Sequence, residues 1–187
     1  MVDLYLVRHA QPLIAPGVCY GALDVPADPA ATRQAAQALA QTLPQSAQVM
    51  TSPLQRCELL ALTLQGLRPD LIYKTDARLV EMNFGNFEGR RWDSIPQDAY
   101  DAWTANFWQH RFGGVESVAD VMARVASAWD EAVSGGKPQV WVTHAGVIRA
   151  ASLLAQGVRR VDQAQHWPQA TLAFGQCLVV RSTKTNT

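Results

Sequence analysis

Three short apolar runs, each followed at once by polar or charged residues, constrain the fold of this chain most strongly. A strand with one face in water alternates apolar and polar residues, whereas a strand buried on both faces is apolar throughout. These runs are continuous, so we expect a sheet covered on both sides. They are Leu4-Tyr5-Leu6-Val7, which ends at Arg8-His9; Gln48-Val49-Met50, which ends at Thr51-Ser52-Pro53; and Val140-Trp141-Val142, which ends at Thr143-His144.

Helical signals fill the segments between these runs. Asp28-Pro29 is typical of an N-cap followed by proline in the first turn, and Ser117 with Asp120 resembles a capping box. Ser52-Pro53 predicts a second helix start, with Gly66 as its stop, and another helix is expected from His144 to about Gly157. Further strand candidates are 71–73 and 177–180. Strands that alternate with helices predict an α/β fold: a three-layer sandwich with a mainly parallel sheet and helices on both faces.

The segment 86–114 breaks this alternation. It is aromatic and irregular, and we interpret it as a cap excursion from the sheet. Its aromatic side chains either form a local core or offer a platform on which a flat heterocycle stacks. With 187 residues, the chain is expected to form a single domain over 1–187.

The charge balance narrows the class of partner. Sixteen basic residues balance sixteen acidic ones, so the net charge is zero and the chain lacks the excess of basic residues typical of a nucleic-acid binder. The most apolar window, 140–158, contains His144 and Arg149, which argues against a membrane segment. Three widely spaced cysteines form no disulfide framework. We expect a cytoplasmic protein with neither a nucleic acid nor a membrane as partner.

Candidate functional residues gather where the expected strands end. In open parallel sheets ligands bind beyond the carboxyl ends of the strands. There the sequence places Arg8 and His9, then Ser52 with Arg56 one turn later, and His144. Two guanidiniums, two imidazoles and two helix N-termini indicate an anion site suited to phosphate.

A neutral imidazole in such a site can attack phosphorus and carry the phosphoryl group covalently. Glu81 is the candidate acid for the leaving oxygen, with nearby Glu88 as the competing glutamate. No acidic cluster has the spacing of metal ligands, so we expect no metal and no cofactor, with the arginines neutralising the phosphoryl oxygens. The plainer interpretations are that His9 and His144 are satisfied core histidines and that Arg56 is a surface charge.

Four separate motifs in order resemble the histidine phosphatase superfamily, also called phosphoglycerate mutase-like. They are Leu6-Val7-Arg8-His9-Ala10, Ser52-Pro53-Leu54-Gln55-Arg56-Cys57, the segment from Glu81 to Gly89, and Thr143-His144-Ala145-Gly146-Val147-Ile148-Arg149. The segments 19–26, 81–89 and 113–117 are similar to the α-ribazole phosphatase branch. The resemblance implies a phosphoglycerate mutase-like fold and hydrolysis of a small-molecule phosphomonoester, with inorganic phosphate as product.

Carried over by motif, the resemblance implies a role for each core residue. His9 is the nucleophile, Glu81 the proton donor, and Arg8, Arg56 and His144 hold the phosphoryl group. Tyr20, Gly21 and Ala145 are implied as further substrate-binding residues. Ala10, Asn83, Asn86 and Val115 depart from the branch pattern and bear on the substrate rather than on the core residues.

The favoured substrate is α-ribazole 5′-phosphate, an intermediate of cobalamin synthesis. The alternatives are a broad-specificity phosphatase, a phosphoglycerate mutase-like phosphotransferase, a protein phosphohistidine phosphatase and a non-catalytic phosphate-binding module. The sequence leaves a homodimer open.

Overall fold

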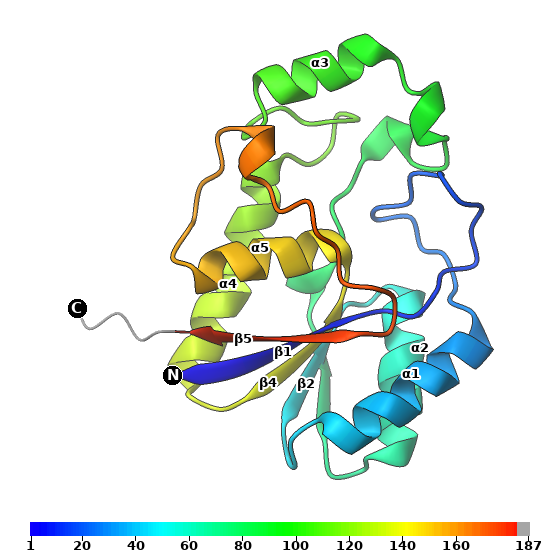
Figure 1. Cartoon of the computed structure of the whole chain (residues 1–187), viewed down its shortest axis with the longest axis vertical. Helices are drawn as coiled ribbons and strands as arrows, with labels where there is room; N and C mark the ends of the chain where they lie inside the picture. Colours follow the sequence, from blue (N-terminus) through cyan, green and yellow to red (C-terminus); the bar gives the residue numbers. More distant parts are fainter. Residues whose placement is uncertain (183–187) are drawn as a thin grey trace.

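The computed structural model describes residues 1–182 and shows a five-stranded sheet between two layers of helices (Figure 1). The strands are β1 (Val2–Arg8), β2 (Gln48–Thr51), β3 (Ile72–Thr75), β4 (Gln139–Thr143) and β5 (Cys177–Ser182). Their order is β3-β2-β4-β1-β5, and only β5 runs antiparallel to its neighbour. The α/β prediction with a mainly parallel sheet is confirmed.

Successive apolar side chains of the central strands enter different cores. Leu4 and Leu6 of β1 and Trp141 of β4 pack in one core, while Val7 and Val140 pack in the other. Because side chains alternate across a strand, a continuous apolar run fills both faces. This is the physical basis on which the sequence predicted a sheet covered on both sides.

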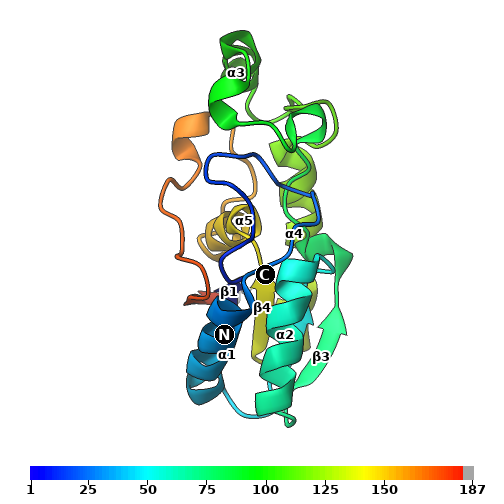
Figure 2. The same ribbon diagram turned by 90° about the vertical axis from the view of Figure 1, so that its right-hand side faces the viewer.

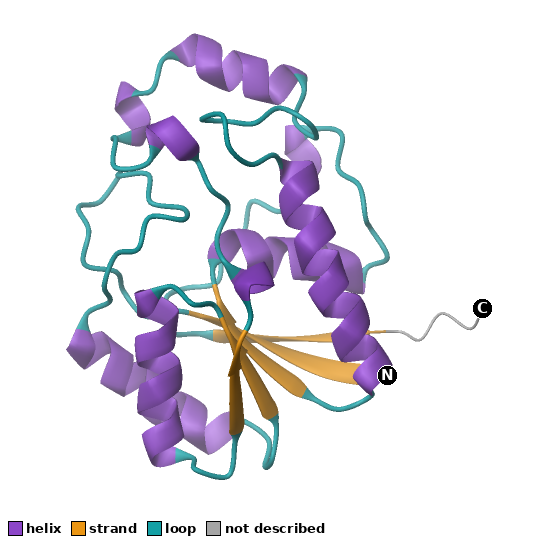
Figure 3. Cartoon of the chain, turned by 180° about the vertical axis from the view of Figure 1, so that it is seen from behind, coloured by secondary structure: helices purple, strands orange, loops and turns teal. Residues whose placement is uncertain are grey.

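The helices divide between the two faces of the sheet. On one side lie α1 (Pro29–Thr42) and α2 (Gln55–Leu67), and on the other α4 (Val118–Gly135) and α5 (Ala145–Ala155). Figure 3 shows the strands as a fan between these layers. In α1 the Asp28 side chain accepts from the N–H of Ala31, and α4 begins with the predicted capping box of Ser117 and Asp120.

The predicted start of α2 at Ser52-Pro53 is wrong by two residues. The helix begins at Gln55, and no local side chain caps it. Its capping acceptor is Asp24, whose Oδ1 lies 2.8 Å from the Gln55 nitrogen. The hydroxyl of Ser52 instead lies 2.8 Å from Nε2 of His144 on the neighbouring β4–α5 connection. A cap that arrives from a distant loop leaves no local sequence signal.

The excursion between β3 and α4 contains one α-helix, α3 (Gln97–Ala105), and three short 3₁₀ turns, Ala77–Leu79, Gly85–Phe87 and Trp92–Ser94. Figures 1 and 2 both place α3 at the end of the molecule remote from α1. Phe112 is fully buried, with the ring of Trp103 stacked on it at 4.4 Å between centroids. The excursion therefore has an aromatic core of its own.

Candidate active site

The carboxyl ends of β1, β2 and β4 are joined by backbone hydrogen bonds beyond the strands. The N–H of His9 donates to the Thr143 carbonyl, and that of Ser52 donates to the Val142 carbonyl, both at 3.0 Å. These bonds bring the three strand ends to one place. As a result the rings of His9 and His144 lie 5.2 Å apart between centroids.

His9 is held as a neutral imidazole with one free nitrogen. Its Nδ1 lies 2.7 Å from the Ala10 carbonyl oxygen, which can only accept, so Nδ1 carries the hydrogen and Nε2 keeps its lone pair. Burial lowers the pKa of His9 to about 3, against the opposing effect of the Ala10 bond, and the positive charges of Arg56 and Arg8 lower it further. A neutral nitrogen with a lone pair is the form that can act as a nucleophile.

His144 is also buried and neutral. It lies immediately before the first turn of α5, where its Nε2 is 2.8 Å from Ser52 Oγ and 3.4 Å from Cys57 Sγ. Burial, and then the charge of Arg56, hold the pKa of His144 well below its usual value. These two neighbours fix the orientation of the ring.

Arg56 is a fully buried cation in the first turn of α2. Its Nη1 donates to the Leu23 carbonyl at 2.8 Å and its Nη2 to the Gly21 carbonyl at 2.6 Å. Desolvation by burial lowers the pKa of Arg56. Within residues 1–182 it forms no ion pair, and its Nε has no hydrogen-bond partner.

Arg8 is the second unpaired cation. Its guanidinium carbon lies 3.9 Å from the centroid of the Phe174 ring, and its Nη1 donates to the Leu172 carbonyl at 2.7 Å. Among the residues that the structure describes, no carboxylate lies within ion-pair distance of Arg8. Because burying an uncompensated charge is costly, the two arginines together favour an anion between them.

Glu81 and Glu88 differ sharply in their surroundings. The Glu81 carboxylate accepts from the N–H groups of Met82 and Gly146, each at 2.9 Å, and it lines the same cavity as His9 and His144. The Glu88 carboxylate accepts three backbone N–H groups, from Ala22, Leu23 and Phe84. Glu88 thus ties the loop that carries Tyr20 and Gly21 to the segment after Glu81, which is a structural task.

Gly21 lies where two loops almost touch. A Cβ at this position would be 1.9 Å from the Met82 carbonyl oxygen, so only glycine fits. The close approach places the Gly21 carbonyl against Arg56. The neighbouring Tyr20 ring lies 5.4 Å from the Arg56 guanidinium carbon, and burial raises the pKa of its hydroxyl.

One cavity of about 280 Å³ is lined by all the predicted catalytic and substrate-binding residues, while Ser52 lies outside its lining and contacts His144 instead. Its lining also contains four residues that sequence reasoning did not assign to the site. The full set is Arg8, His9, Tyr20, Gly21, Arg56, Glu81, Phe84, Trp92, His144, Ala145, Arg149 and Thr171. Arg149 could have been assigned to the site from the sequence, because it is the only charged residue in the apolar helix α5. Thr171 lies in an irregular loop, and no sequence pattern marks it.

A second cavity, of about 220 Å³, adjoins the first. The two share Glu81, Phe84, Trp92 and Arg149 as a common boundary. The second cavity extends from there to Trp103, Phe107 and Trp167, and its walls are mainly aromatic and aliphatic. The excursion therefore supplies both an internal aromatic core and part of a cavity wall.

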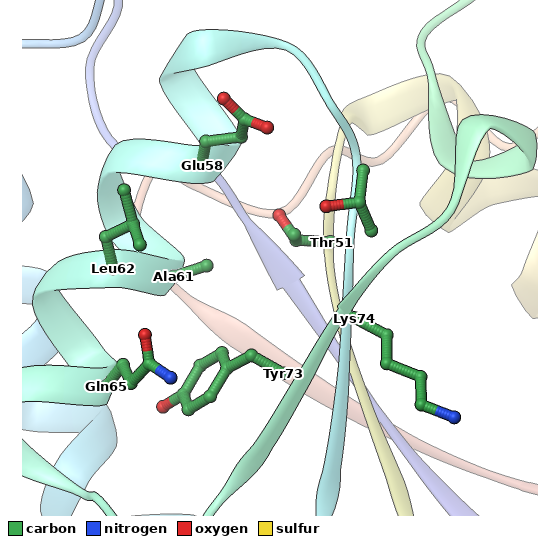
Figure 4. A pocket seen from close by; sticks show the side chains of 8 residues that line it. Thr51, Glu58, Ala61, Leu62, Gln65, Tyr73 and Lys74 are labelled. Atoms are coloured by element: carbon green, nitrogen blue, oxygen red, sulfur yellow. The ribbon is translucent and has the colours of Figure 1, made fainter.

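A further hollow of about 180 Å³ lies away from this site, between α2 and β3 (Figure 4). Its lining includes Glu58, Tyr73 and Lys74 but no imidazole and no arginine. Within residues 1–182 no group of histidine, cysteine, aspartate and glutamate side chains is arranged to hold a metal ion. No helix in the same range is long and apolar enough to cross a membrane.

The structure defines an α/β protein whose cavity brings two histidines and several arginines together, and comparison with known proteins gives the family. The sequence profile of the Histidine phosphatase superfamily (branch 1) matches residues 4–177. The chain belongs to this superfamily and is an enzyme of the phosphatase class.

Individual relatives agree with this assignment. A Hydrogenobacter thermophilus protein provisionally named phosphoserine phosphatase 2 is 30% identical over 164 residues, covering 84% of this chain and 80% of that protein. The structure of TTHB049 from Thermus thermophilus is 28% identical with a TM-score of 0.71, covering 96% and 93%. A mycobacterial glucosyl-3-phosphoglycerate phosphatase, 24% identical with a TM-score of 0.79 and coverage of 95% and 89%, shares the fold.

Proposed function

We propose that this protein hydrolyses small-molecule phosphomonoesters through a phosphohistidine formed on His9. The observation that carries the proposal is a neutral imidazole with a free Nε2, held in one cavity with three guanidiniums, of Arg8, Arg56 and Arg149, that form no ion pair within residues 1–182. A site that only bound phosphate would not need a desolvated, oriented imidazole.

In the first step, Nε2 of His9 attacks phosphorus, and the bond from phosphorus to the ester oxygen breaks. Arg8, Arg56 and His144 surround the phosphoryl oxygens and stabilise their charge in the transition state. The departing oxygen takes a proton from Glu81. The leaving group is thereby released as an alcohol, Glu81 becomes a carboxylate, and the imidazole carries the phosphoryl group.

In the second step, the Glu81 carboxylate takes a proton from water, and the water oxygen attacks the phosphohistidine. The bond from nitrogen to phosphorus breaks, inorganic phosphate forms, and Glu81 and His9 return to their starting states. Release of free phosphate distinguishes this reaction from a phosphotransferase, which would return the group to a second substrate.

For the substrate we propose α-ribazole 5′-phosphate, whose flat base fits an aromatic pocket. The second cavity supports this choice because it adjoins the phosphoryl site at Glu81 and is lined by Trp92, Trp103 and Phe107. Aromatic walls bind a planar ring by burial and stacking. Arg149 lines both cavities, and in this proposal it donates to oxygen atoms of the sugar between base and phosphate.

The test compares kcat/KM for α-ribazole 5′-phosphate, phosphoserine and p-nitrophenyl phosphate. Replacing Trp103→Ala should raise KM for α-ribazole 5′-phosphate about fivefold, the loss of one aromatic contact, and leave phosphoserine unchanged. The control is Tyr100→Phe, which alters the same excursion outside both cavities and loses only the bond to the Trp92 carbonyl. Equal losses on both substrates, or a clear preference for phosphoserine, would contradict the choice of substrate.

A further inference from the structure

A partly buried ion pair, Glu116 with Arg124, bears on how Glu81 is held. Glu116 lies just before α4, and Arg124 lies on the second turn of that helix. Arg124 Nε is 2.7 Å from Glu116 Oε1 and Arg124 Nη2 is 3.1 Å from Glu116 Oε2, a two-pronged contact. Their side chains are only 19% and 17% exposed. Neither residue lines the phosphoryl cavity.

Arg124 binds the backbone before Glu81, and Glu116 binds the backbone after it. On one side, Arg124 Nη1 donates to the Arg78 carbonyl at 2.8 Å and to the Val80 carbonyl at 2.6 Å. On the other, Glu116 Oε2 accepts from the Asn83 N–H at 2.9 Å. The pair thus spans Glu81, with one contact at the residue before it and one at the second residue after it.

The segment held in this way has no regular structure of its own. Residues 80–84 lie between the 3₁₀ turns Ala77–Leu79 and Gly85–Phe87, so no helix or strand ladder fixes their path. The pair binds two backbone groups of this segment, at Val80 and Asn83, and one in the turn before it, at Arg78. Such contacts restrict the segment strongly, because charge-assisted hydrogen bonds are the strong ones. A proton donor misplaced by about 1 Å loses about 100-fold in rate.

We infer that Glu116 and Arg124 are positioning residues for proton transfer by Glu81. They act through the backbone of residues 78–83 and do not touch the substrate. This inference rests on the proposed role of Glu81 as the acid for the leaving group.

The experiment measures kcat/KM over a series of phosphate esters with leaving groups from p-nitrophenol to simple alcohols. A good leaving group needs little protonation, so loss of the acid affects poor leaving groups most. Arg124→Gln and Glu116→Gln should each lower kcat/KM for alkyl esters about 10- to 100-fold, as expected for a misplaced acid. Hydrolysis of p-nitrophenyl phosphate should change far less, so the dependence on leaving-group pKa becomes steeper.

A matched control exists at the C-terminal end of α2. Arg68 makes the same kind of contact, a two-pronged pair with Asp70 at 2.7 and 2.8 Å together with bonds to the Ala40 and Leu43 carbonyls. Arg68→Gln should lower the melting temperature to a similar extent and leave the leaving-group dependence unchanged. All assays are run well below the lowest melting temperature, so partial unfolding does not enter the comparison.

The double variant Glu81→Gln/Arg124→Gln gives the decisive comparison. If Arg124 acts through Glu81, the double variant loses no more on alkyl esters than Glu81→Gln alone. Additive losses, or equal losses on every ester in Arg124→Gln, would overturn the positioning role. If Glu81→Gln lowers kcat/KM equally for every ester, the assignment of Glu81 as the acid fails instead. The two failures are therefore distinguishable.

Discussion

The backbone N–H of Gly146, in the first turn of α5, donates to the Glu81 carboxylate at 2.9 Å. The contact ties a carboxylate on an irregular loop to the helix that begins directly after His144. It also leaves no room for a side chain, since a Cβ on Gly146 would lie 2.2 Å from Glu81 Oε1. The proposed proton donor and the helix are therefore fitted to each other through a glycine.

Gly146→Ala should displace Glu81 and slow the hydrolysis of esters with poor leaving groups about 10- to 100-fold, because the acid moves from its position. Steady-state kcat/KM with an alkyl and a nitrophenyl phosphate measures the effect. The control is Gly135→Ala in α4, where a Cβ meets nothing within 4 Å. Both changes add an alanine to a helix, and they differ in the contact with Glu81 and in the second cavity, which Gly146 lines and Gly135 does not. Equal activity in the two variants would show that Glu81 does not need this position.

His9→Gln should lower kcat by about 10⁶-fold, the loss seen when a nucleophile is removed. Rapid quenching in alkali with ³²P-labelled substrate should show an acid-labile phosphoprotein in the wild type and none in the variant. Binding of inorganic phosphate should persist in His9→Gln, because Arg8 and Arg56 remain. A variant that keeps most of its activity, or still becomes labelled, would remove His9 from the covalent step.

The sheet could be predicted because both faces of its strands are apolar. In β1, Leu6 enters one core and Val7 the other, so the run of apolar residues itself reports the two layers. The start of α2 could not be predicted in this way. Its acceptor, Asp24, lies 31 residues away in sequence, and the local candidate Ser52 bonds to His144. Local patterns predict local contacts and fail where a distant side chain replaces them.

The same distinction applies to the site. Arg8, His9 and His144 could be predicted because Arg8 ends a buried strand and the two histidines directly follow one, and strand ends of a parallel sheet meet at one edge. Thr171 reaches the cavity through a loop without periodicity, and no pattern marks it. The contacts of Glu116 and Arg124 could not be predicted either. They bind backbone groups, which every residue carries, so no side-chain pattern marks them.

Treatment with EDTA should leave kcat/KM unchanged. In the proposed mechanism the charges that neutralise the phosphoryl oxygens come from Arg8 and Arg56, and no group of histidine, cysteine, aspartate and glutamate side chains in residues 1–182 is arranged to hold a metal ion. The measurement uses enzyme dialysed against EDTA and assayed with and without added Mg²⁺. Activity that disappears with the chelator and returns with the metal would contradict this mechanism.

The stability of the fold should decrease as the pH falls from about 6.5 toward 3. Burial lowers the pKa of His9 to about 3 and that of His144 well below its usual value. In the unfolded chain both histidines have a pKa of about 6.5. Between these values the unfolded chain binds more protons, so stability is fully present above the unfolded pKa and is lost as the pH falls. Each group contributes a slope of up to about 1.4 kcal/mol per pH unit.

Urea unfolding at pH 7, 6 and 5, in buffer free of phosphate and sulfate, measures this slope. His9→Gln should reduce it by the contribution of one group, since glutamine takes up no proton in this range. His166→Gln serves as the control, because it removes an exposed imidazole outside the cavity. Carboxylates contribute to the slope in every variant and cancel in the comparison. A slope in His9→Gln as steep as that of the wild type would mean that His9 is not held neutral by the fold, and the nucleophile would then need another means of losing its proton.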